Sequence, residues 1–355
     1  MTLINRPAMP EKPSRFHDSG IDLDGASILI TGGSGSFGRR LAHELLSRYR
    51  PRRVAIYSRD EAKQVDMQQE FQAHDNFSAM RFFIGDVRDQ QRLKLAMREV
   101  DYVIHAAALK HVPVAEYNPM ECIHTNVLGA ENVVYAALEN RVKRVVALST
   151  DKAVNPINLY GASKLASDKI FVAANNLSGS AGTIFSVVRY GNVVGSRGSV
   201  VPLFQRLLAA GATSLPVTDP RMTRFWITLS EGVDFVLSSL QVMRGGEIFV
   251  PKIPSMKITD LVAAMCPAAK VDVVGIRPGE KLHEMMISAD DARTTAELGD
   301  RFAIEPAFVE YPRQPFRLNG GPAAVPEDFS YASDTNTEWL TGEALMAMVG
   351  EKVAA

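Results

Sequence analysis

The chain has 355 residues, of which 46% are hydrophobic and 22% are charged. At about 150 residues per domain, this length predicts two domains or one large domain with a smaller lobe, and the apolar content excludes wholesale disorder. The 39 basic and 40 acidic residues leave a net charge of −1, which argues against a nucleic-acid binder that works by bulk electrostatics. Two cysteines, Cys122 and Cys266, are too few for a disulfide framework or a structural zinc site.

Targeting and metal-binding signals are weak in this sequence. No run approaches 18 consecutive apolar residues, so we expect no membrane span, and the polar first 25 residues lack the apolar core of a signal peptide. His105, His111 and His283 have no partners at metal-ligand spacing, so we interpret them as structural and expect no metal. The sequence therefore predicts a reduced, cytoplasmic protein without nucleic-acid or membrane partners.

Short apolar runs alternate with stretches long enough for helices. The run Ser27–Ile30 is typical of a buried strand, and Leu41 and Leu45 recur at helical spacing from Phe37 onward. Further strands are predicted at Val54–Tyr57, Met80–Ile84, Tyr102–His105, Arg144–Ser149, Thr183–Arg189 and Glu247–Pro251. The alternation predicts an α/β fold, namely a Rossmann-type doubly wound parallel sheet.

The composition changes after Tyr190 to segments rich in Gly, Pro and Ser, which predicts a smaller C-terminal lobe interleaved with the sheet. We assign residues 1–25 to a polar leader and 26–190 to the Rossmann domain, with later contributions near 225–250. Residues 191–305 form the predicted substrate-binding lobe, and 306–355 a tail. The tail is expected to be loop-like from Gly320 until a short helix near Glu343–Val349.

A glycine-rich loop follows the first predicted strand. Thr31–Gly38 contains Gly33-x-Gly35-x-x-Gly38 between a buried strand and an amphipathic helix, the context in which this pattern binds a dinucleotide. Glycine lets the backbone approach the pyrophosphate, and the helix N-terminus stabilises the charge. The alternative is a tight strand-to-helix turn without a ligand. The candidate cofactor residues in the loop are Gly32, Gly35, Ser36, Phe37 and Gly38.

The end of the second strand indicates which dinucleotide binds. An NAD site usually places a carboxylate there to hold the ribose 2′-hydroxyl, whereas this chain has Ser58 and Arg59, with Lys63 one helical turn further. A hydroxyl and two cations suit a 2′-phosphate, so we predict NADP rather than NAD. Asp60 keeps NAD open, and the two cations could instead be an ordinary solvated face.

Residues after the third and fourth strands complete the predicted cofactor site. Asp86 and Val87 follow the third strand, where a side chain could meet the adenine. Ala106 and Ala107 follow the fourth, and their small side chains would let a nicotinamide ribose lie against the backbone. Each pair alone is more often a packing feature, but their order along the chain favours cofactor binding.

The candidate catalytic residues lie at and after the end of the fifth strand. Thr150, Asp151 and Lys152 end the strand, and Tyr160 and Lys164 follow it. Tyr160 and Lys164 are four residues apart on a predicted helix and therefore share a face. An ammonium beside a phenol lowers the phenol pKa and makes it a usable base near neutral pH. The bland alternatives are a surface pair for Tyr160 and Lys164, and a strand-end salt bridge for Asp151 and Lys152.

From about Ser27 to Phe302 the chain resembles the extended short-chain dehydrogenase/reductases that modify sugar nucleotides. The motifs that carry this resemblance are Thr31–Gly38, Asp86-Val87, His105–Ala108, Asn126, Thr150, Tyr160, Lys164 and Arg189–Asn192. Longer stretches are similar to the inverting 4,6-dehydratases of UDP-N-acetylglucosamine: Ala108–Pro113, Asn155–Tyr160, Gly191–Pro202, Arg221–Thr228 and Gly275–His283. Lys152 after Asp151 favours this type, as does Tyr160, because the related retaining dehydratases and epimerases typically carry methionine there.

The resemblance implies a reaction without net redox change. Tyr160, assisted by Lys164 and Thr150, would deprotonate the sugar 4-hydroxyl as hydride passes from C4 to tightly bound NADP. Lys152, with a depressed amine pKa, would take the C5 proton, and Asp151, with a raised pKa, would protonate the departing 6-hydroxyl. The expected product is UDP-2-acetamido-2,6-dideoxy-β-L-arabino-hexos-4-ulose, at the first step of pseudaminic acid biosynthesis. A retaining 4,6-dehydratase or an epimerase is the alternative.

The resemblance also implies substrate contacts and an assembly. Lys110 could reach both cofactor and sugar, and the other implied substrate residues are Asn192, Arg197, Arg277 and Glu280. In this interpretation Arg277 contacts the diphosphate and Glu280 a ribose hydroxyl. Arg221 and Arg224 could equally bind substrate or brace the lobe. The family implies a homo-oligomer, with a hexamer as one candidate.

Overall fold

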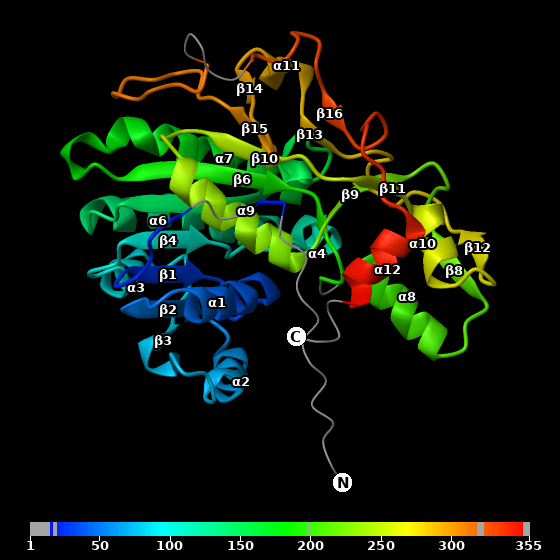
Figure 1. The fold of residues 1–355 in the computed structure, drawn as a ribbon, viewed down its shortest axis with the longest axis horizontal. Coiled ribbons are helices and arrows are strands. Elements are labelled where there is room, and N and C mark those ends of the chain that lie inside the picture. The colour runs from blue at the N-terminus through cyan, green and yellow to red at the C-terminus, as the bar shows by residue number, and fades with distance from the viewer. Residues whose placement is uncertain (1–14, 17–19, 197–198, 318–322, 351–355) are drawn as a thin grey trace.

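A nine-stranded sheet organises the computed structural model, which describes residues 15–16, 20–196, 199–317 and 323–350 (Figure 1). The strand order is β14 (Thr295–Glu297), β15 (Arg301–Ile304), β10 (Ile248–Pro251), β6 (Ile184–Tyr190), β5 (Arg144–Thr150), β4 (Tyr102–His105), β1 (Ser27–Thr31), β2 (Arg53–Ser58) and β3 (Met80–Ile84). The strands from β3 to β10 in this order are parallel, whereas β15 pairs antiparallel with both β10 and β14. The predicted Rossmann-type α/β fold is confirmed.

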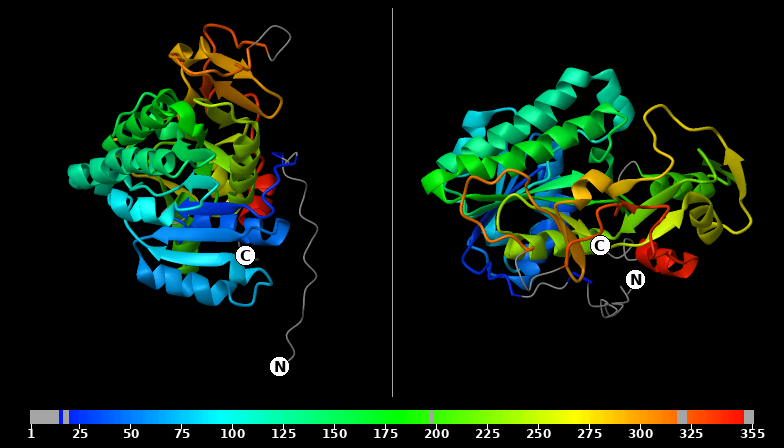
Figure 2. Two further views of the ribbon diagram at one scale, coloured as in Figure 1. Left: turned by 90° about the vertical axis from the view of Figure 1, so that its left-hand side faces the viewer. Right: turned by 90° about the horizontal axis from the view of Figure 1, so that it is seen from above.

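Helices cover both faces of the sheet, as the side view in Figure 2 shows. Helix α1 (Ser36–Arg48) packs beside α9 (Leu229–Val242), while α3 (Gln90–Ala96), α6 (Gly129–Glu139) and α7 (Leu159–Leu177) lie side by side over the other face. All five residues of β1 are buried, as expected for a parallel strand covered on both faces. Leu41 and Leu45, predicted to face the sheet from α1, are fully buried.

Shorter helices connect these elements. Helix α2 (Glu61–Phe71) follows β2, and α4 (Val112–Tyr117), α5 (Pro119–Ile123) and a π-helical segment η2 (His124–Leu128) lead from β4 into α6. Three 3₁₀ turns complete this half of the chain: η1 (Phe77–Ala79), η3 (Asp151–Ala153) and η4 (Gly179–Ala181). The turn η3 directly follows β5 and carries two of the candidate catalytic residues.

A second, smaller lobe lies on the right-hand side of Figure 1 and has its own apolar core around Phe204 and Trp226. Its small sheets contain β7 (Asn192–Val193), β9 (Thr223–Ile227) and β11 (Ser255–Lys257), then β8 (Ser214–Val217) with β12 (Lys270–Val273). A further pair, β13 (Met285–Ile287) with β16 (Tyr331–Ala332), lies at the top of Figure 1 and adds Met286 and Tyr331 to the main core. The helices of this part of the chain are α8 (Val200–Ala209), α10 (Ile258–Met265), α11 (Ala289–Ala292) and α12 (Gly342–Gly350). None of the helices in the described ranges is long and apolar enough to cross a membrane.

Each predicted strand forms within one residue of its expected ends, and the predicted C-terminal helix is α12. The prediction of a loop-like tail was wrong at Tyr331, because β16 pairs with β13 and the Tyr331 hydroxyl is hydrogen-bonded to the backbone of Ile253. Strands β14 and β15, inside the range assigned to the substrate lobe, extend the main sheet instead. The domain boundaries themselves stay a prediction.

The segment before β1 is packed into the molecule where it is described. Phe16 is fully buried and meets Phe235 of α9 edge-on, with ring centroids 5.0 Å apart. Arg15 pairs with Glu338, and its guanidinium donates to the Lys252 carbonyl at 2.6 Å. The sequence predicted only a polar leader here, without a role, since the partners of Arg15 and Phe16 lie in distant segments of the chain.

Replacing Phe16 by alanine should therefore destabilise the fold. We expect Phe16→Ala to lower the free energy of unfolding by about 3 kcal/mol, since a buried aromatic ring and its contact with Phe235 are lost. Urea denaturation followed by tryptophan fluorescence measures the change. Phe308→Ala is the matched control, because Phe308 is 84% exposed. Equal stability of the two variants would contradict a packed leader.

Candidate active site

A cavity of about 660 Å³ opens at the carboxyl edge of the parallel strands, where the strand order reverses between β1 and β4. Most of the predicted site residues line it: Gly32, Gly35, Ser36, Phe37, Gly38, Ser58, Arg59, Lys63, Asp86, Val87, Ala106, Ala107, Lys110, Thr150, Lys152, Tyr160, Lys164 and Asn192. Asp151 is fully buried behind this lining, and Arg277 and Glu280 lie outside it. Arg197 lies outside the described residues.

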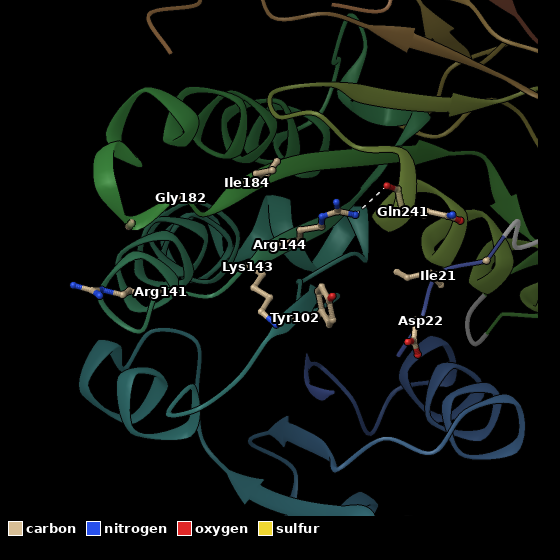
Figure 3. A pocket seen from close by; sticks show the side chains of 11 residues that line it. Ile21, Asp22, Tyr102, Arg141, Lys143, Arg144, Gly182, Ile184 and Gln241 are labelled. Atoms are coloured by element: carbon tan, nitrogen blue, oxygen red, sulfur yellow. Dashed lines mark hydrogen bonds between the residues drawn. The ribbon is translucent and has the colours of Figure 1, made fainter. Parts of the chain in front are cut away.

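A second cavity, of about 510 Å³, lies at the opposite edge of the sheet (Figure 3). Two of the cationic side chains that line it have structural partners. Lys143 pairs with Asp101 at 3.0 Å, and Arg144 donates to the carbonyls of Leu240 and Gln241 at the end of α9. Since none of the predicted site residues lines this cavity, the candidate active site is the first one.

The glycine loop is packed so closely that side chains would not fit. Gly32 has a φ of +65°, and a Cβ there would lie 2.9 Å from the Ala107 backbone. A Cβ at Gly38 would lie 2.3 Å from the Gly33 carbonyl oxygen. In the described structure, the first turn of α1 has neither a side-chain cap nor an acidic residue, so its backbone N–H groups remain for a ligand. This cradle fits the pyrophosphate of a dinucleotide.

The end of β2 carries hydroxyl groups rather than a free carboxylate. Ser34 Oγ donates to Ser58 Oγ at 2.8 Å, and Gln64 holds the Ser58 carbonyl at 2.8 Å. Asp60 caps α2: its side chain accepts from the Lys63 backbone N–H at 3.0 Å and also pairs with the Lys63 amine. The Asp60 carboxylate, which the sequence offered as a partner for the ribose of NAD, is therefore engaged in capping α2.

A small ion cluster lies beside this end of the cavity. Asp86 Oδ2 is 2.8 Å from Arg88 Nη2 and 3.5 Å from Arg59 Nη1. Burial opposes ionisation of Asp86, but hydrogen bonds and charge from Arg88, together with Arg59, hold the pKa of its carboxyl below the ordinary value. The Arg59 guanidinium thus lines the cavity where the second strand ends, and Arg88 lies on the other side of the Asp86 carboxylate.

The loop after β4 is fixed by an asparagine in the π-helical segment. Asn126 accepts from the Leu109 N–H at 2.8 Å, and its amide donates to the Leu109 carbonyl and to Ser163 Oγ, both at 2.9 Å. Such π-helical insertions frequently occur at functional sites. Because Ser163 lies on α7, Asn126 links the loop that carries Lys110 to the helix that carries Tyr160.

The turn η3 packs directly against the start of α7. A Cβ on Gly161 would lie 2.2 Å from the Lys152 carbonyl oxygen, so glycine after Tyr160 is required by this contact. Asn158 caps α7 by accepting from the Gly161 N–H at 2.8 Å. Thr150 ends β5 and donates to Asp151 Oδ1 at 2.9 Å. The structure therefore brings the candidate acid, amine and phenol to one side of the cavity.

The environment of Tyr160 differs from the sequence prediction. Burial raises the pKa of the phenol to about 12, against the lowering effects of the Lys152 charge and a hydrogen bond with Thr150. The expectation that Lys164 lowers this pKa was wrong, since the opposing cation is Lys152 and burial outweighs it. Burial also lowers the pKa of the Lys164 amine, and Asp168 one turn further along α7 counteracts that effect.

Lys152 lies between two carboxylates. Its Nζ is 3.0 Å from Asp151 Oδ1 and 3.4 Å from Glu284 Oε1, and 3.5 Å from the side-chain oxygen of Asn192. Burial alone would lower the pKa of this amine, but the charges of Asp151 and Glu284 outweigh it and raise the pKa above its ordinary value. The predicted depressed pKa was wrong because Glu284, 132 residues further along the chain, carries no local sequence signal.

The second lobe closes one side of this cluster. Arg224 is buried and donates to the carbonyls of Thr223, Leu282 and Lys281, so it braces the loop before β13. Glu280 Oε1 lies 3.7 Å from Arg224 Nη2. Arg221, by contrast, is exposed and pairs with Asp219 at 2.7 Å. These contacts favour the bracing interpretation for Arg224; the substrate roles of Arg277 and Glu280 stay a prediction.

Of the three histidines predicted to be structural, His105 and His283 have hydrogen-bond partners, whereas His111 lines the cavity. His105 Nδ1 is 2.8 Å from Thr31 Oγ1, and His283 Nδ1 is 2.8 Å from Thr223 Oγ1. Burial lowers the pKa of His105 to about 3, which keeps its ring neutral at physiological pH. Within the described ranges, no group of three or more His, Cys, Asp or Glu side chains could hold a metal ion.

The chain belongs to the polysaccharide biosynthesis protein family, a branch of the extended short-chain dehydrogenase/reductases, whose model matches residues 28–306. It is 57% identical over 331 residues to the "UDP-N-acetylglucosamine 4,6-dehydratase (inverting)" of Campylobacter jejuni, covering 92% of this chain and 98% of that one. A "UDP-glucose 4-epimerase" of Rickettsia typhi is 44% identical over 78% of this chain and 82% of its own. Among solved structures, the dTDP-glucose 4,6-dehydratase DesIV of Streptomyces venezuelae, with NAD and TYD bound, matches with a TM-score of 0.63 and 25% identity, over 72% of this chain and 86% of that one.

A methyl group on Gly38 should disrupt the loop. We expect Gly38→Ala to lower the free energy of unfolding by about 2 kcal/mol and to remove copurifying nucleotide, because the Cβ would overlap the backbone of Gly33. Thermal unfolding and the nucleotide content of the purified protein measure both effects. Gly232→Ala in α9 is the matched control: a Cβ there meets nothing within 4 Å, so this change should be neutral or stabilising. Unchanged nucleotide content in Gly38→Ala would contradict the cradle.

Proposed function

We propose that this protein is an inverting UDP-N-acetylglucosamine 4,6-dehydratase with tightly bound NADP. The observation that carries the proposal is the Asp151–Lys152 pair beside Tyr160, at the edge of a cavity whose glycine loop fits a dinucleotide. The relative from Campylobacter jejuni supports the substrate and the stereochemical class. The DesIV structure supports a nicotinamide dinucleotide as the cofactor class.

The proton chemistry follows from the three side chains. When bound, the dinucleotide would accept a hydride from sugar carbon 4 and return it to carbon 6. Tyr160 accepts the proton of the 4-hydroxyl, helped by the Lys152 charge and the Thr150 hydrogen bond that already act against its raised pKa. The 4-ketone formed in this step acidifies the hydrogen on carbon 5.

The Lys152–Asp151 pair holds one proton, which is the number that the dehydration step needs. Moving it from Nζ to Asp151 Oδ1, 3.0 Å away, produces a neutral amine and a carboxylic acid together. The amine then takes the C5 proton, and the acid protonates the 6-hydroxyl, which leaves as water. The ion pair is thereby restored. The proton that Tyr160 took from the 4-hydroxyl balances the remaining step: its delivery to C5 on the opposite face, directly or through solvent, inverts that carbon and resets the phenol.

Binding of the sugar nucleotide falls to residues on both sides of the cavity. Lys110 and Asn192 line it and are proposed to contact the sugar. Arg277, with Arg197, is proposed to neutralise the diphosphate, and Glu280 to hold the uridine ribose. We further propose a homo-oligomer.

The 44% identical epimerase relative makes epimerisation at C4 the second candidate function. An epimerase of this fold uses the phenol and the cofactor but has no step for a paired acid and base. The buried Asp151 beside Lys152 therefore favours dehydration.

Proton NMR in deuterated water separates these functions. With UDP-N-acetylglucosamine and no added reductant, we expect a new C6 methyl signal, deuterium at C5 and ring couplings of the L-arabino product. D-xylo couplings would indicate a retaining dehydratase. N-acetylgalactosamine couplings without a methyl signal would indicate an epimerase and overturn the proposal.

The role of Lys152 has its own test. Lys152→Ala should lower the rate of methyl formation by about 100-fold or more, because the C5 base is lost, while bound NADP is retained. The same NMR assay and the nucleotide content measure the two effects. Lys257→Ala, at an exposed site on β11, serves as the control. Unimpaired turnover by Lys152→Ala would exclude its role as the base.

The preference for NADP can be tested at Arg59. We expect the nucleotide-free protein to bind NADP more tightly than NAD, and Arg59→Ala to weaken NADP binding roughly tenfold without changing NAD binding, since only the 2′-phosphate loses a partner. Isothermal titration measures both affinities. Arg52→Ala, whose exposed side chain pairs with Glu99, is the control. Equal losses for the two nucleotides would argue against a 2′-phosphate contact.

A further inference from the structure

A buried carboxylate of the second lobe reaches the catalytic cluster. Glu284 is 2% exposed and directly precedes β13. Its backbone is fixed on both sides, because its N–H donates to Ser333 Oγ at 2.9 Å and its carbonyl accepts from the Ser333 N–H at 2.8 Å. Ser333 is itself hydrogen-bonded to Thr223. The side chain therefore projects from a rigid, twice-anchored position.

The two carboxylate oxygens of Glu284 have different surroundings. Oε1 lies 3.4 Å from Lys152 Nζ and 3.8 Å from Arg224 Nε. Oε2 is buried and has no hydrogen-bond partner within the described part of the chain, and the same holds for Oδ2 of Asp151. Burying an unpaired carboxylate oxygen is unfavourable, and such sites call for a functional explanation.

The charged groups around Lys152 come from several elements. Asp151 and Tyr160 face it from the first lobe, and Glu284, Arg224 and Lys281 from the second. Arg224 opposes the charge on Lys152, and Lys281 lies in the same field while its amine donates to the Val154 carbonyl. Glu284 is thus the second-lobe carboxylate in contact with the amine.

We propose that Glu284 is a positioning residue for Lys152 that acts at the C5 proton-transfer step and not at the C4 step. The inference rests on the proposed dehydratase function. The ion pair with the fixed Glu284 carboxylate holds Nζ beside Asp151, so the amine is in place when it passes its proton to Asp151 and takes the C5 proton. Glu284 itself neither gains nor loses a proton: the C5–H bond breaks, the Nζ–H bond forms, and the 6-hydroxyl leaves with the proton from Asp151.

The two halves of the reaction can be measured separately in Glu284→Gln. Formation of reduced cofactor in a single turnover should stay within about twofold of wild type, while deuterium exchange at C5 falls about tenfold or more, because only the second step needs the Lys152 amine held in place. Glu297→Gln removes an exposed carboxylate of β14 and is the matched control. Equal slowing of both steps, or no change in either, would overturn the inference.

A second readout does not depend on turnover. Acetylation of Lys152 by acetic anhydride, followed by mass spectrometry across a pH series, reports how readily the amine becomes neutral. Removing the Glu284 charge lowers the pKa of Lys152, so its acetylation curve should move to lower pH by about one unit, with Lys257 as the internal reference. An unshifted curve would show that Glu284 does not act on this amine.

Glu284→Asp guards against a trivial folding defect. It keeps the charge on a shorter side chain, so it should retain more C5 exchange than Glu284→Gln at a similar unfolding temperature; equal loss of exchange in both variants overturns the inference. If wild-type protein itself forms no methyl product and exchanges no C5 proton, the proposed function fails. The acetylation series would still decide whether Glu284 and Lys152 are coupled.

Discussion

The ammonium of Lys152 lies where the two lobes meet, and much of the site depends on how it is held. Asp151 approaches it from the turn after β5, and Glu284 from the position just before β13. Two carboxylates around one cation leave a net negative charge in a buried place, which Arg224 partly compensates. Because buried charges must be paired to be tolerated, this cluster fixes the relative position of η3 and the second lobe.

Close backbone contacts provide the rest of the precision. The glycine loop lies against the backbone of the β4 loop, and Gly161 lets the start of α7 touch η3. Asn126 then joins the β4 loop to α7 through Ser163. Cofactor cradle, phenol and amine are consequently parts of one packed unit. Their spacing is set by atoms that cannot move apart without breaking the fold, as preorganised catalysis requires.

Local patterns were sufficient for the sheet and for the cofactor side of the site. Buried parallel strands are short apolar runs, and glycines with a following amphipathic helix mark the phosphate loop, so β1 to β6 and residues from Gly32 to Lys63 could be placed from the sequence. Local patterns cannot show which distant segments come together. The contact of Glu284 with Lys152 and that of Phe16 with Phe235 join residues more than a hundred positions apart. The pKa values of Tyr160 and Lys152 were mispredicted for the same reason, because burial and a remote carboxylate decide them.

The clasp between Arg15 and Glu338 spans 323 positions of the chain. During synthesis, Arg15 and Phe16 emerge before β1, whereas Glu338, the partner of Arg15, emerges after the whole main sheet. Phe235, which receives the Phe16 ring, is also made long after β1 to β6 could have assembled. Arg15 and Phe16 therefore stay undocked until α9 and Glu338 have been made, so their contacts form after those of the first six strands. A fusion partner placed ahead of residue 15 would be attached to this late-docking segment.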